Sequence, residues 1–430
     1  MITTINNEHK KLNFSSEREQ SQACLNSAEH EKNQGRKVLN VPNLRFPEFQ
    51  GEWEKTKFGD IATGFDYGMN AAAKNYNGVN KYIRITDIDE ASSTYTDKDI
   101  VSPDGVLTDN YLVNNRDILL ARTGASTGKS YLYKKSDGKL YYAGFLIRAN
   151  VTTHDPYFVF SQLHTHRYWR WVSIMSARSG QPGINSQEYS SFPIYTTSIE
   201  EESKIAKLLS LLDERIATQN KIIEDLKKLK SAIIDYAINS LNTDFAKFGS
   251  LYEMAGEGGT PTTSNASFYD NGKIPFIKID DLKQKYLTEN KDFITELGLQ
   301  KSSAWLVPTH SILFSNGATI GEISITTYPV CTKQGILGIV PKQNIDVEFL
   351  YYFMSSSYFK KAVSRIVTEG TMKTAYLKDI NNILCPIPTK EKQQEIAKMP
   401  SALNSKIDFE QSILKLFCSQ KQYLLRQMFI

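Results

Sequence analysis

The sequence predicts an α+β fold in which two similar mixed α/β domains are separated by two long antiparallel heptad helices. This arrangement would be an internal duplication with pseudo-twofold symmetry. Three observations lead to the prediction: a long heptad stretch lies mid-chain, the end of the chain repeats it, and the segments before the two stretches resemble each other. At 430 residues, the chain also exceeds one ordinary domain.

The first long helix is predicted over residues 200–239, which contain neither glycine nor proline. Such a helix would be about 60 Å long, at about 1.5 Å per residue. Apolar residues recur in a four-three pattern, which Gln219 and Lys230 complete. The apolar members of this series are Ile205, Leu209, Leu212, Ile216, Ile223, Leu226, Ile233 and Ala237.

The second long helix is predicted near the end of the chain, where TKEKQQEIAKMPSALNSKI aligns with SIEEESKIAKLLSLLDERI at an offset of 191 residues. Pro400 stands where the first copy has Leu209. Proline inside a helix costs roughly 3 kcal/mol, so we expect this helix to kink at Pro400 or to begin after it. Its heptad members are Ile396, Leu403, Ile407, Leu414, Phe417, Leu424 and Met428.

The segments before the two helices also match, at offsets between 190 and 194 residues. DILLARTGASTG (Asp117–Gly128) resembles SILFSNGATIG (Ser311–Gly321), and YIRITDI resembles FIKIDDL. Asp137 and Gly138 are predicted to form a type I′ turn leading into the return strand of a hairpin. The predicted organisation is a disordered tail (1–39), a first domain (40–198) with its helix (199–240), and a second domain (241–388) with its helix (389–430).

Composition favours globular domains, with 40% hydrophobic and 23% charged residues. The four cysteines form no C-x-x-C pair, so we expect neither a zinc site nor a disulfide framework. No apolar run is long enough to span a membrane, and the first residues do not resemble a secretory signal, so a cytoplasmic location is expected.

Positive charge gathers in the first domain, although the net charge of the chain is only +4. Residues 110–198 hold ten Lys and Arg residues against four Asp and Glu residues, a surplus of six. The stretch THRYWRWVSIMSAR interleaves cations with aromatic side chains, which suits a surface facing phosphates. A solvated face above core aromatics would give the same pattern, so charge alone leaves both interpretations open.

The duplicated pattern resembles a known family. The helices that follow FPIYTTSIEEESKIAK and CPIPTKEKQQEIAK resemble the conserved regions of the specificity subunits of Type I restriction–modification systems. NVPNLRFPEFQGEW (Asn40–Trp53) resembles the opening segment of such subunits from Gram-positive bacteria, of staphylococcal type. The resemblance covers both helices, the opening segment and the strand–turn motifs, whereas the intervening stretches match nothing specific.

The resemblance implies two target-recognition domains, each reading one half of a bipartite double-stranded DNA target. It implies a non-catalytic subunit that directs adenine methylation and restriction by its partners. Those partners would be two copies of an adenine methyltransferase subunit and a restriction/translocase subunit. The chain itself would hold no cofactor and no metal, and S-adenosylmethionine and ATP would bind only to partner subunits.

Three motifs suggest catalysis, but each has a simpler explanation. TGASTGKS is one residue short of a phosphate-binding loop, and the second copy has Glu322 where the lysine would be. Asp155-Pro156-Tyr157-Phe158 lacks the second proline of the methyltransferase tetrad. Pro103-Asp104 with Asp137-Gly138-Lys139 imitates a nuclease core but has no counterpart in the second domain. His164 and His166 are interpreted as surface or DNA-facing groups.

Candidate DNA-binding residues are polar or cationic and lie on segments expected to be exposed, because such groups match the donor and acceptor patterns of DNA grooves. In the first domain they are Arg122, Lys129, Arg167, Arg170, Arg178, Gln181 and Asn185. In the second domain they are Lys278, Asn316, Lys333, Gln334, Arg365, Thr371 and Lys373.

The first helix carries more apolar residues than a two-helix seam requires, which predicts a docking face for the methyltransferase. The predicted docking residues are Leu208, Leu211, Ile222, Leu229 and Ile234. The heptads could instead dimerise the protein, but two such segments in one chain can pair with each other. A self-contained methyltransferase–nuclease and a coiled-coil scaffold unrelated to DNA remain the alternative functions.

Overall fold

The computed structural model describes residues 39–177, 182–317, 319–367 and 373–430. The predicted tail lies outside these residues except for Leu39. The chain divides into two compact units: the first comprises Met1–Asp213 together with Gln420–Ile430, and the second comprises Glu214–Ser419. Within the described residues, no helix is both long and apolar enough to cross a membrane.

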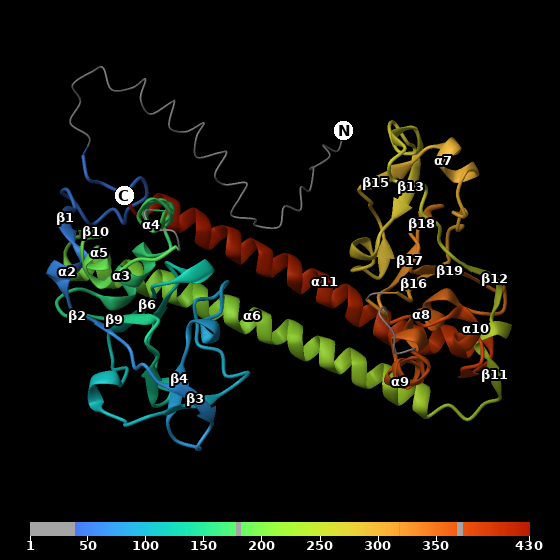
Figure 1. The fold of residues 1–430 in the computed structure, drawn as a ribbon, viewed down its shortest axis with the longest axis horizontal. Coiled ribbons are helices and arrows are strands. Elements are labelled where there is room, and N and C mark those ends of the chain that lie inside the picture. Colours follow the sequence, from blue (N-terminus) through green and yellow to red (C-terminus); the bar gives the residue numbers. More distant parts are fainter. Residues whose placement is uncertain (1–38, 178–181, 318, 368–372) are drawn as a thin grey trace. The chain divides into compact units, whose positions relative to one another are not determined.

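The first unit is built on a four-stranded antiparallel sheet in the order β2-β9-β6-β7 (Figure 1). Its central strand β6 (Asp117–Ala121) is buried along its whole length. The other strands of the unit are β1 (Glu54–Lys57), β2 (Ala62–Tyr67), β3 (Ala72–Asn75), β4 (Lys81–Ile83), β5 (Val101–Asp104), β7 (Ser130–Leu132), β8 (Leu140–Tyr142), β9 (Leu146–Val151) and β10 (Pro193–Thr196). Its short helices are α2 (Phe58–Ile61), α3 (Pro156–Gln162), α4 (His166–Ser176) and α5 (Ser186–Ser190).

The hairpin predicted after Gly138 is not formed. Residues Lys135–Asp137 form a 3-10 helix, and β8 pairs in parallel with β4. Gly138 has a positive φ of 82°, but Asp137 does not, so the type I′ turn is also wrong. The Tyr131 hydroxyl donates a hydrogen bond to the Asp137 carboxylate at 2.6 Å, which holds this carboxylate inside the fold. A tertiary contact therefore overrides the local turn signal.

The second unit contains a five-stranded sheet in the order β12-β19-β16-β17-β14, in which β14 and β17 are parallel (Figure 1). Its strands are β11 (Phe245–Lys247), β12 (Tyr252–Glu257), β13 (Ile274–Ile277), β14 (Tyr286–Leu287), β15 (Asp292–Ile294), β16 (Ile312–Ser315), β17 (Ile323–Thr326), β18 (Cys331–Thr332), β19 (Ile336–Pro341) and β20 (Leu384–Pro386). Its short helices are α7 (Glu296–Gln300), α8 (Val347–Ser355), α9 (Ser357–Ile366) and α10 (Leu377–Ile380).

The two long helices are α6 (Ile199–Asn239) and α11 (Lys390–Gln427). α11 runs through Pro400, so the prediction that it begins only after this proline is wrong. Pro400 itself is buried. Proline removes one backbone hydrogen-bond donor from the helix. The helix tolerates this loss at a position where the proline side chain packs against the protein.

Polar contacts show that α6 and α11 pack antiparallel where they meet within a unit. In the second unit, Gln219 donates hydrogen bonds to the backbone oxygen and the carboxylate of Glu410, and Lys230 donates to Asn404. In the first unit, Lys421 forms an ion pair with Asp213 at 2.6 Å. Higher numbers on one helix thus pair with lower numbers on the other.

The internal repeat of 191 residues relates these contacts to one another. Gln219 and Glu410 occupy equivalent positions in the two copies and bond to each other. Asp213 and Lys421 are equivalent to Asn404 and Lys230, so the outer two contacts also join equivalent pairs. Burial lowers the pKa of the Lys230 ammonium, since burial disfavours its charged form. Buried polar pairs of this kind fix the register of packed helices.

Candidate nucleic-acid interface

The Gly-rich loop that follows β6 is a tight turn fixed by the protein itself. Gly124 donates its backbone N–H to the oxygen of Pro182, and the Thr127 hydroxyl donates to the oxygen of Gly124. Gly128 has a φ of +94°, and its N–H donates to the oxygen of Ala121 and to the Tyr189 hydroxyl. These backbone donors are therefore occupied by protein atoms, as expected for a turn rather than a phosphate-binding loop.

Arg122 lies at the start of this loop, with its side chain partly buried. Its guanidinium carbon stands 4.5 Å from the ring centroid of Tyr67. Its Nε atom is buried and has no hydrogen-bond partner among the described residues. A cavity of about 350 Å³ lies beside it, lined in part by Asn185 and Glu188. Two predicted DNA-binding residues, Arg122 and Asn185, therefore border one cavity.

Other candidates of the first unit have different surroundings. Lys129 is paired with Glu90 at 3.5 Å, and Arg170 is exposed on α4. Asn185 caps α5 by accepting a hydrogen bond from the N–H of Glu188, and its own side chain is exposed. Arg178 and Gln181 lie outside the described residues.

Arg167 and His164 do not face outward as predicted. Arg167 donates to the oxygen of Pro193 and to the side chain of Gln162, and burial lowers its pKa to about 10. His164 contacts the oxygen of Phe160 and the hydroxyl of Ser93, and burial lowers its pKa to about 4. Both side chains connect α4 and its preceding turn to the rest of the unit, so neither is free to contact DNA. The other histidine of this pair, His166, is exposed.

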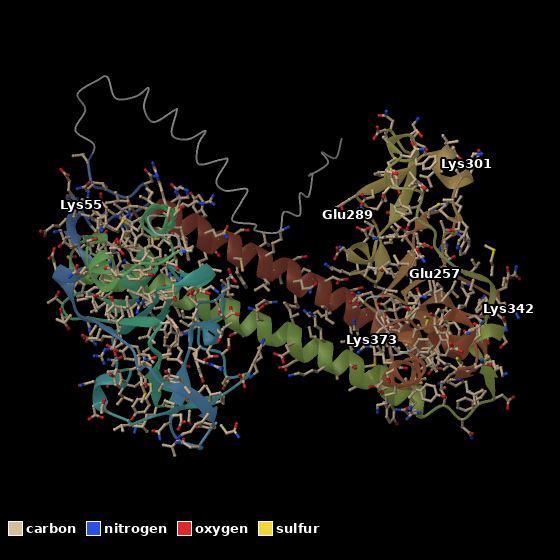
Figure 2. All side chains as sticks on the ribbon, viewed as in Figure 1. Lys55, Glu257, Glu289, Lys301, Lys342 and Lys373 are labelled. Carbon is tan, nitrogen blue, oxygen red and sulfur yellow. The ribbon has the colours of Figure 1, made fainter. Side chains whose placement is uncertain are left out.

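In the second unit the candidates divide in the same way. Asn316 is only 1% exposed and donates to the oxygen of Ala375, so the prediction that it faces DNA is wrong. Lys278 forms an ion pair with Asp292 at 2.7 Å. Lys278 is itself exposed, and so are Lys333, Gln334, Arg365 and Lys373, the last of which is labelled in Figure 2. Thr371 lies outside the described residues.

Three of the five residues predicted to form the docking face of α6 are exposed apolar side chains. Leu211, Ile222 and Leu229 are exposed by 44%, 40% and 48%. Leu208 is half-buried. Ile234, however, is buried in the core of the second unit together with Ile238, so its assignment to the docking face is wrong. Near its end, α6 thus buries a second apolar face in the core of the second unit.

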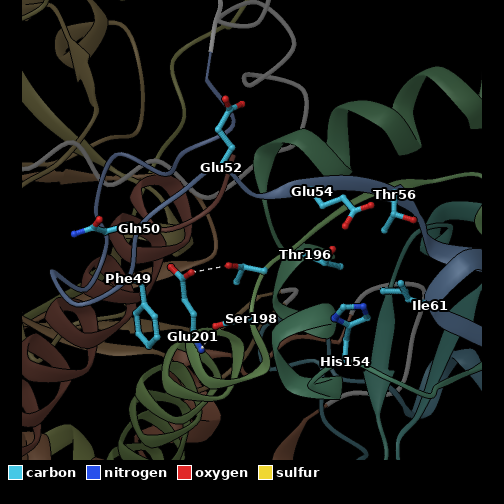
Figure 3. A pocket seen from close by; sticks show the side chains of 11 residues that line it. Phe49, Gln50, Glu52, Glu54, Thr56, Ile61, His154, Thr196, Ser198 and Glu201 are labelled. Carbon is cyan, nitrogen blue, oxygen red and sulfur yellow. Dashed lines mark hydrogen bonds between the residues drawn. The ribbon is translucent and has the colours of Figure 1, made fainter.

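A second cavity, of about 480 Å³, lies near the start of α6 (Figure 3). Its lining includes Glu52, Glu54 and Glu201, so it is poorly suited to phosphate groups. The Glu201 carboxylate forms a bidentate ion pair with Arg45. It also accepts a hydrogen bond from the Thr197 hydroxyl, drawn as the dashed line to Glu201 in Figure 3. These contacts tie the opening segment of the chain to α6.

Sequence reasoning missed Tyr67 and Phe145, which lie next to Arg122 in the fold. Phe145 is 63% exposed and its oxygen accepts the backbone N–H of Arg122. Tyr67 is 42% exposed and comes from β2. The strand order β2-β9-β6 brings these residues together from segments far apart in sequence. No local motif marks them, so only the strand pairing could have identified them.

Comparison with known proteins assigns the chain to a family. A protein described as the type I restriction enzyme MjaX specificity subunit, from Methanocaldococcus jannaschii, is 25% identical over 285 residues, which is 62% of this chain and 65% of the relative. The chain thus spans just under two thirds of that relative. The MjaVIII specificity subunit of the same organism is 24% identical over 85% of this chain and 89% of its own length.

A solved structure supports the fold at the level of the whole chain. The S subunit of a Type I restriction–modification system from M. genitalium matches with a TM-score of 0.57 and 17% identity, over 91% of this chain and 99% of its own. The narrower prediction of a Gram-positive, staphylococcal type receives no support from these relatives. The family described as "Type I restriction modification DNA specificity domain" matches twice, over residues 50–228 and 242–416. The chain belongs to this family.

Proposed function

We propose that this protein is the specificity subunit of a Type I restriction–modification complex and that each unit reads one half of a bipartite DNA target. The observation that carries the proposal is the double family match on a duplicated chain. Each copy combines a mixed domain with a long helix, α6 or α11. A duplicated reader suits a target made of two separated half-sites.

The protein acts without catalysis of its own in this proposal. It directs adenine methylation by two copies of a methyltransferase subunit and cleavage by a restriction/translocase subunit. S-adenosylmethionine and ATP bind to those partners and not to this chain. Equivalent positions that bond across α6 and α11, such as Gln219 and Glu410, support an approximate twofold symmetry that would present similar surfaces to the two methyltransferase copies.

The function is tested by mapping methylated adenine genome-wide in cells that express this chain together with a Type I methyltransferase subunit. The control cells carry the methyltransferase alone. We expect a new bipartite methylated motif that requires this chain. Absence of any motif, although the two proteins co-purify, would contradict the proposal. If neither a motif nor a complex is found, a scaffold unrelated to DNA is favoured.

The docking face is tested by replacing Ile222 and Leu229 with aspartate. Both side chains are exposed, so the substitutions should leave the fold intact while placing charge on the apolar face. We expect the variant to lose co-purification with the methyltransferase. The matched control replaces Asn220 and Lys227, which are exposed polar positions of the same helix, with aspartate. Equal binding by the two variants would exclude this face.

A further inference from the structure

Arg122 differs from the other partly buried arginines of the first unit because none of its guanidinium nitrogens bonds to a described residue, whereas Arg167 leaves only its Nε unpaired. Arg45, Arg84 and Arg148 form ion pairs, and Arg116 donates to backbone oxygens. The guanidinium of Arg122 has no ion pair or hydrogen bond to any described residue, and its Nε is buried. A buried donor without a partner loses its hydrogen bonds to water and gains none from the protein, which is unfavourable. Such a cost is recovered when a ligand supplies the missing acceptor.

The side chain is nevertheless held in one place. The ring of Tyr67 packs against the guanidinium at 4.5 Å, and the Tyr67 hydroxyl accepts a hydrogen bond from the N–H of Ser186 at 3.3 Å. The backbone of Arg122 is bonded on both sides, to Phe145 and to Ile184. A donor group that is fixed before binding loses little entropy when a ligand arrives.

The adjoining cavity indicates what kind of acceptor fits. It is lined by the apolar side chains of Met175 and Ile184 and by the carboxylate-bearing Glu188. A phosphate would be repelled by this carboxylate, whereas the flat, uncharged edge of a base would not. Guanine presents two acceptors, O6 and N7, in the major groove, which match the fork of an arginine.

We propose that Arg122 is a specificity-determining residue of the first unit and that it reads a guanine in one half-site. This inference rests on the proposed function. The second unit has no equivalent reader at this position, because the repeat places Asn316 there and its amide is turned to Ala375. The guanine preference should therefore belong to one half of the target only.

The test compares the methylated motifs of the wild type and of three variants, R122A, R122K and R122Q, each co-expressed with the methyltransferase. In R122A and R122K, we expect the preference for guanine at one position of one half-site to fall by about 5- to 150-fold. In R122Q the preference should shift toward adenine, since glutamine matches the adenine edge. The other half-site should stay unchanged, which also shows that the protein is folded.

A control variant, K55A, removes a positive charge from an exposed position of β1 in the same unit (Figure 2). It should leave the motif unchanged. An unchanged motif in all three Arg122 variants would overturn the inference while leaving the proposed function intact. A uniform loss of methylation in R122A that R122K restores would indicate a phosphate contact and would also overturn it. If the wild type yields no motif, the proposed function fails and this inference fails with it.

Discussion

The two units use different side chains, a carboxylate and an amide, to hold the backbone near the start of their long helices. In the first unit, Glu202 accepts hydrogen bonds from the backbone N–H groups of Asp155 and Thr197. In the second unit, the equivalent Gln393 accepts from the N–H of Asp346 but donates to the oxygen of Pro388.

The difference follows from one backbone atom. Pro388 stands where the first unit has Thr197, and proline has no N–H to donate. An amide at position 393 turns its NH₂ group toward the remaining carbonyl, where a carboxylate would be repelled. The two copies therefore differ at two residues that contact each other, while the backbone arrangement is the same. The repeat keeps its geometry although its residue types change.

The largest expected effect contrasts two glycines of the repeated loop. Gly128 and Gly321 both have positive φ, but a Cβ at Gly128 would lie 2.7 Å from Val172 and 3.0 Å from Trp169, whereas one at Gly321 would meet nothing. We expect Gly128→Ala to destabilise the first unit by about 2–5 kcal/mol and Gly321→Ala to destabilise the second by about 1–2 kcal/mol. Native-state hydrogen exchange of β6 and β16 measures each unit separately. Equal losses of stability in the two variants would show that the first unit shifts to accommodate a Cβ at position 128.

The second effect exchanges the acceptor and donor at the helix starts. Gln393→Glu would set a carboxylate against the oxygens of Pro388 and Asn344, which now accept from the amide at 2.9 and 3.3 Å. We expect a loss of about 1–3 kcal/mol in the second unit. Glu202→Gln in the first unit should cost about 1 kcal/mol, because the remaining amide oxygen can keep the contacts with Thr197 and His154 while only the N–H of Asp155 loses its acceptor. Denaturant unfolding of each unit, followed by hydrogen exchange, measures the two losses of stability. A larger loss for Glu202→Gln than for Gln393→Glu would contradict the idea that each side chain matches the backbone groups around it.

The third effect concerns pH and should appear only in the first unit. His164 stays neutral in the folded protein because burial lowers its pKa to about 4, and the repeat places Ser355 at the equivalent position. The unfolded chain binds a proton near pH 6.5, so stability from this group is full above that pH and is lost as the pH falls toward 4. At pH 5 we expect this to cost about 1–2 kcal/mol relative to pH 7.5.

His164→Gln should remove this part of the pH dependence. The measurement is the stability of each unit between pH 7.5 and pH 4.5, for the wild type and the variant. Parallel profiles for the two proteins would show that His164 can be protonated in the folded state.

The smallest effect compares the outer polar contacts of the long helices. Asp213 pairs with Lys421 as two charges, whereas Lys230 contacts the neutral Asn404. We expect Asp213→Asn to cost about 1 kcal/mol in the first unit and to cost less in 1 M salt. Asn404→Ala should cost about 0.5–1 kcal/mol in the second unit and be insensitive to salt. Thermal unfolding at low and high salt distinguishes the two contacts. A stability loss for Asn404→Ala that depends on salt would contradict the description of this contact as one to a neutral side chain.

Much of the fold could be predicted because repetition makes weak signals stronger. The heptads of α6 and α11 and the buried strands β6 and β16 were all visible as repeated patterns. Local turn chemistry was less reliable. Asp137-Gly138 looked like a hairpin turn, but the hydrogen bond from Tyr131 to Asp137 and the pairing of β8 with β4 override it.

The candidate site was harder to predict, because residue type does not reveal burial. Arg122 and Arg167 look equivalent in the sequence, yet one borders a cavity and the other bonds to Pro193 inside the unit. The apolar pattern of the first long helix predicts a docking face that includes both Ile222 and Ile234, but Ile234 lies in a core formed mainly by residues of the second domain. Only tertiary packing separates the members of each pair.

The first unit is not contiguous along the chain, because Gln420–Ile430 belong to it. Phe429 packs against Trp53 and Phe158 with ring centroids 6.1 and 5.4 Å apart, and the oxygen of Gln427 accepts the N–H of Leu44. A ribosome adds about 5–20 residues per second, so residues 420–430 emerge tens of seconds after Trp53. The unit whose synthesis starts first is therefore completed last. During that interval Trp53 and Phe158 lack their contacts with Phe429, so part of the core of the nascent first unit stays open to solvent.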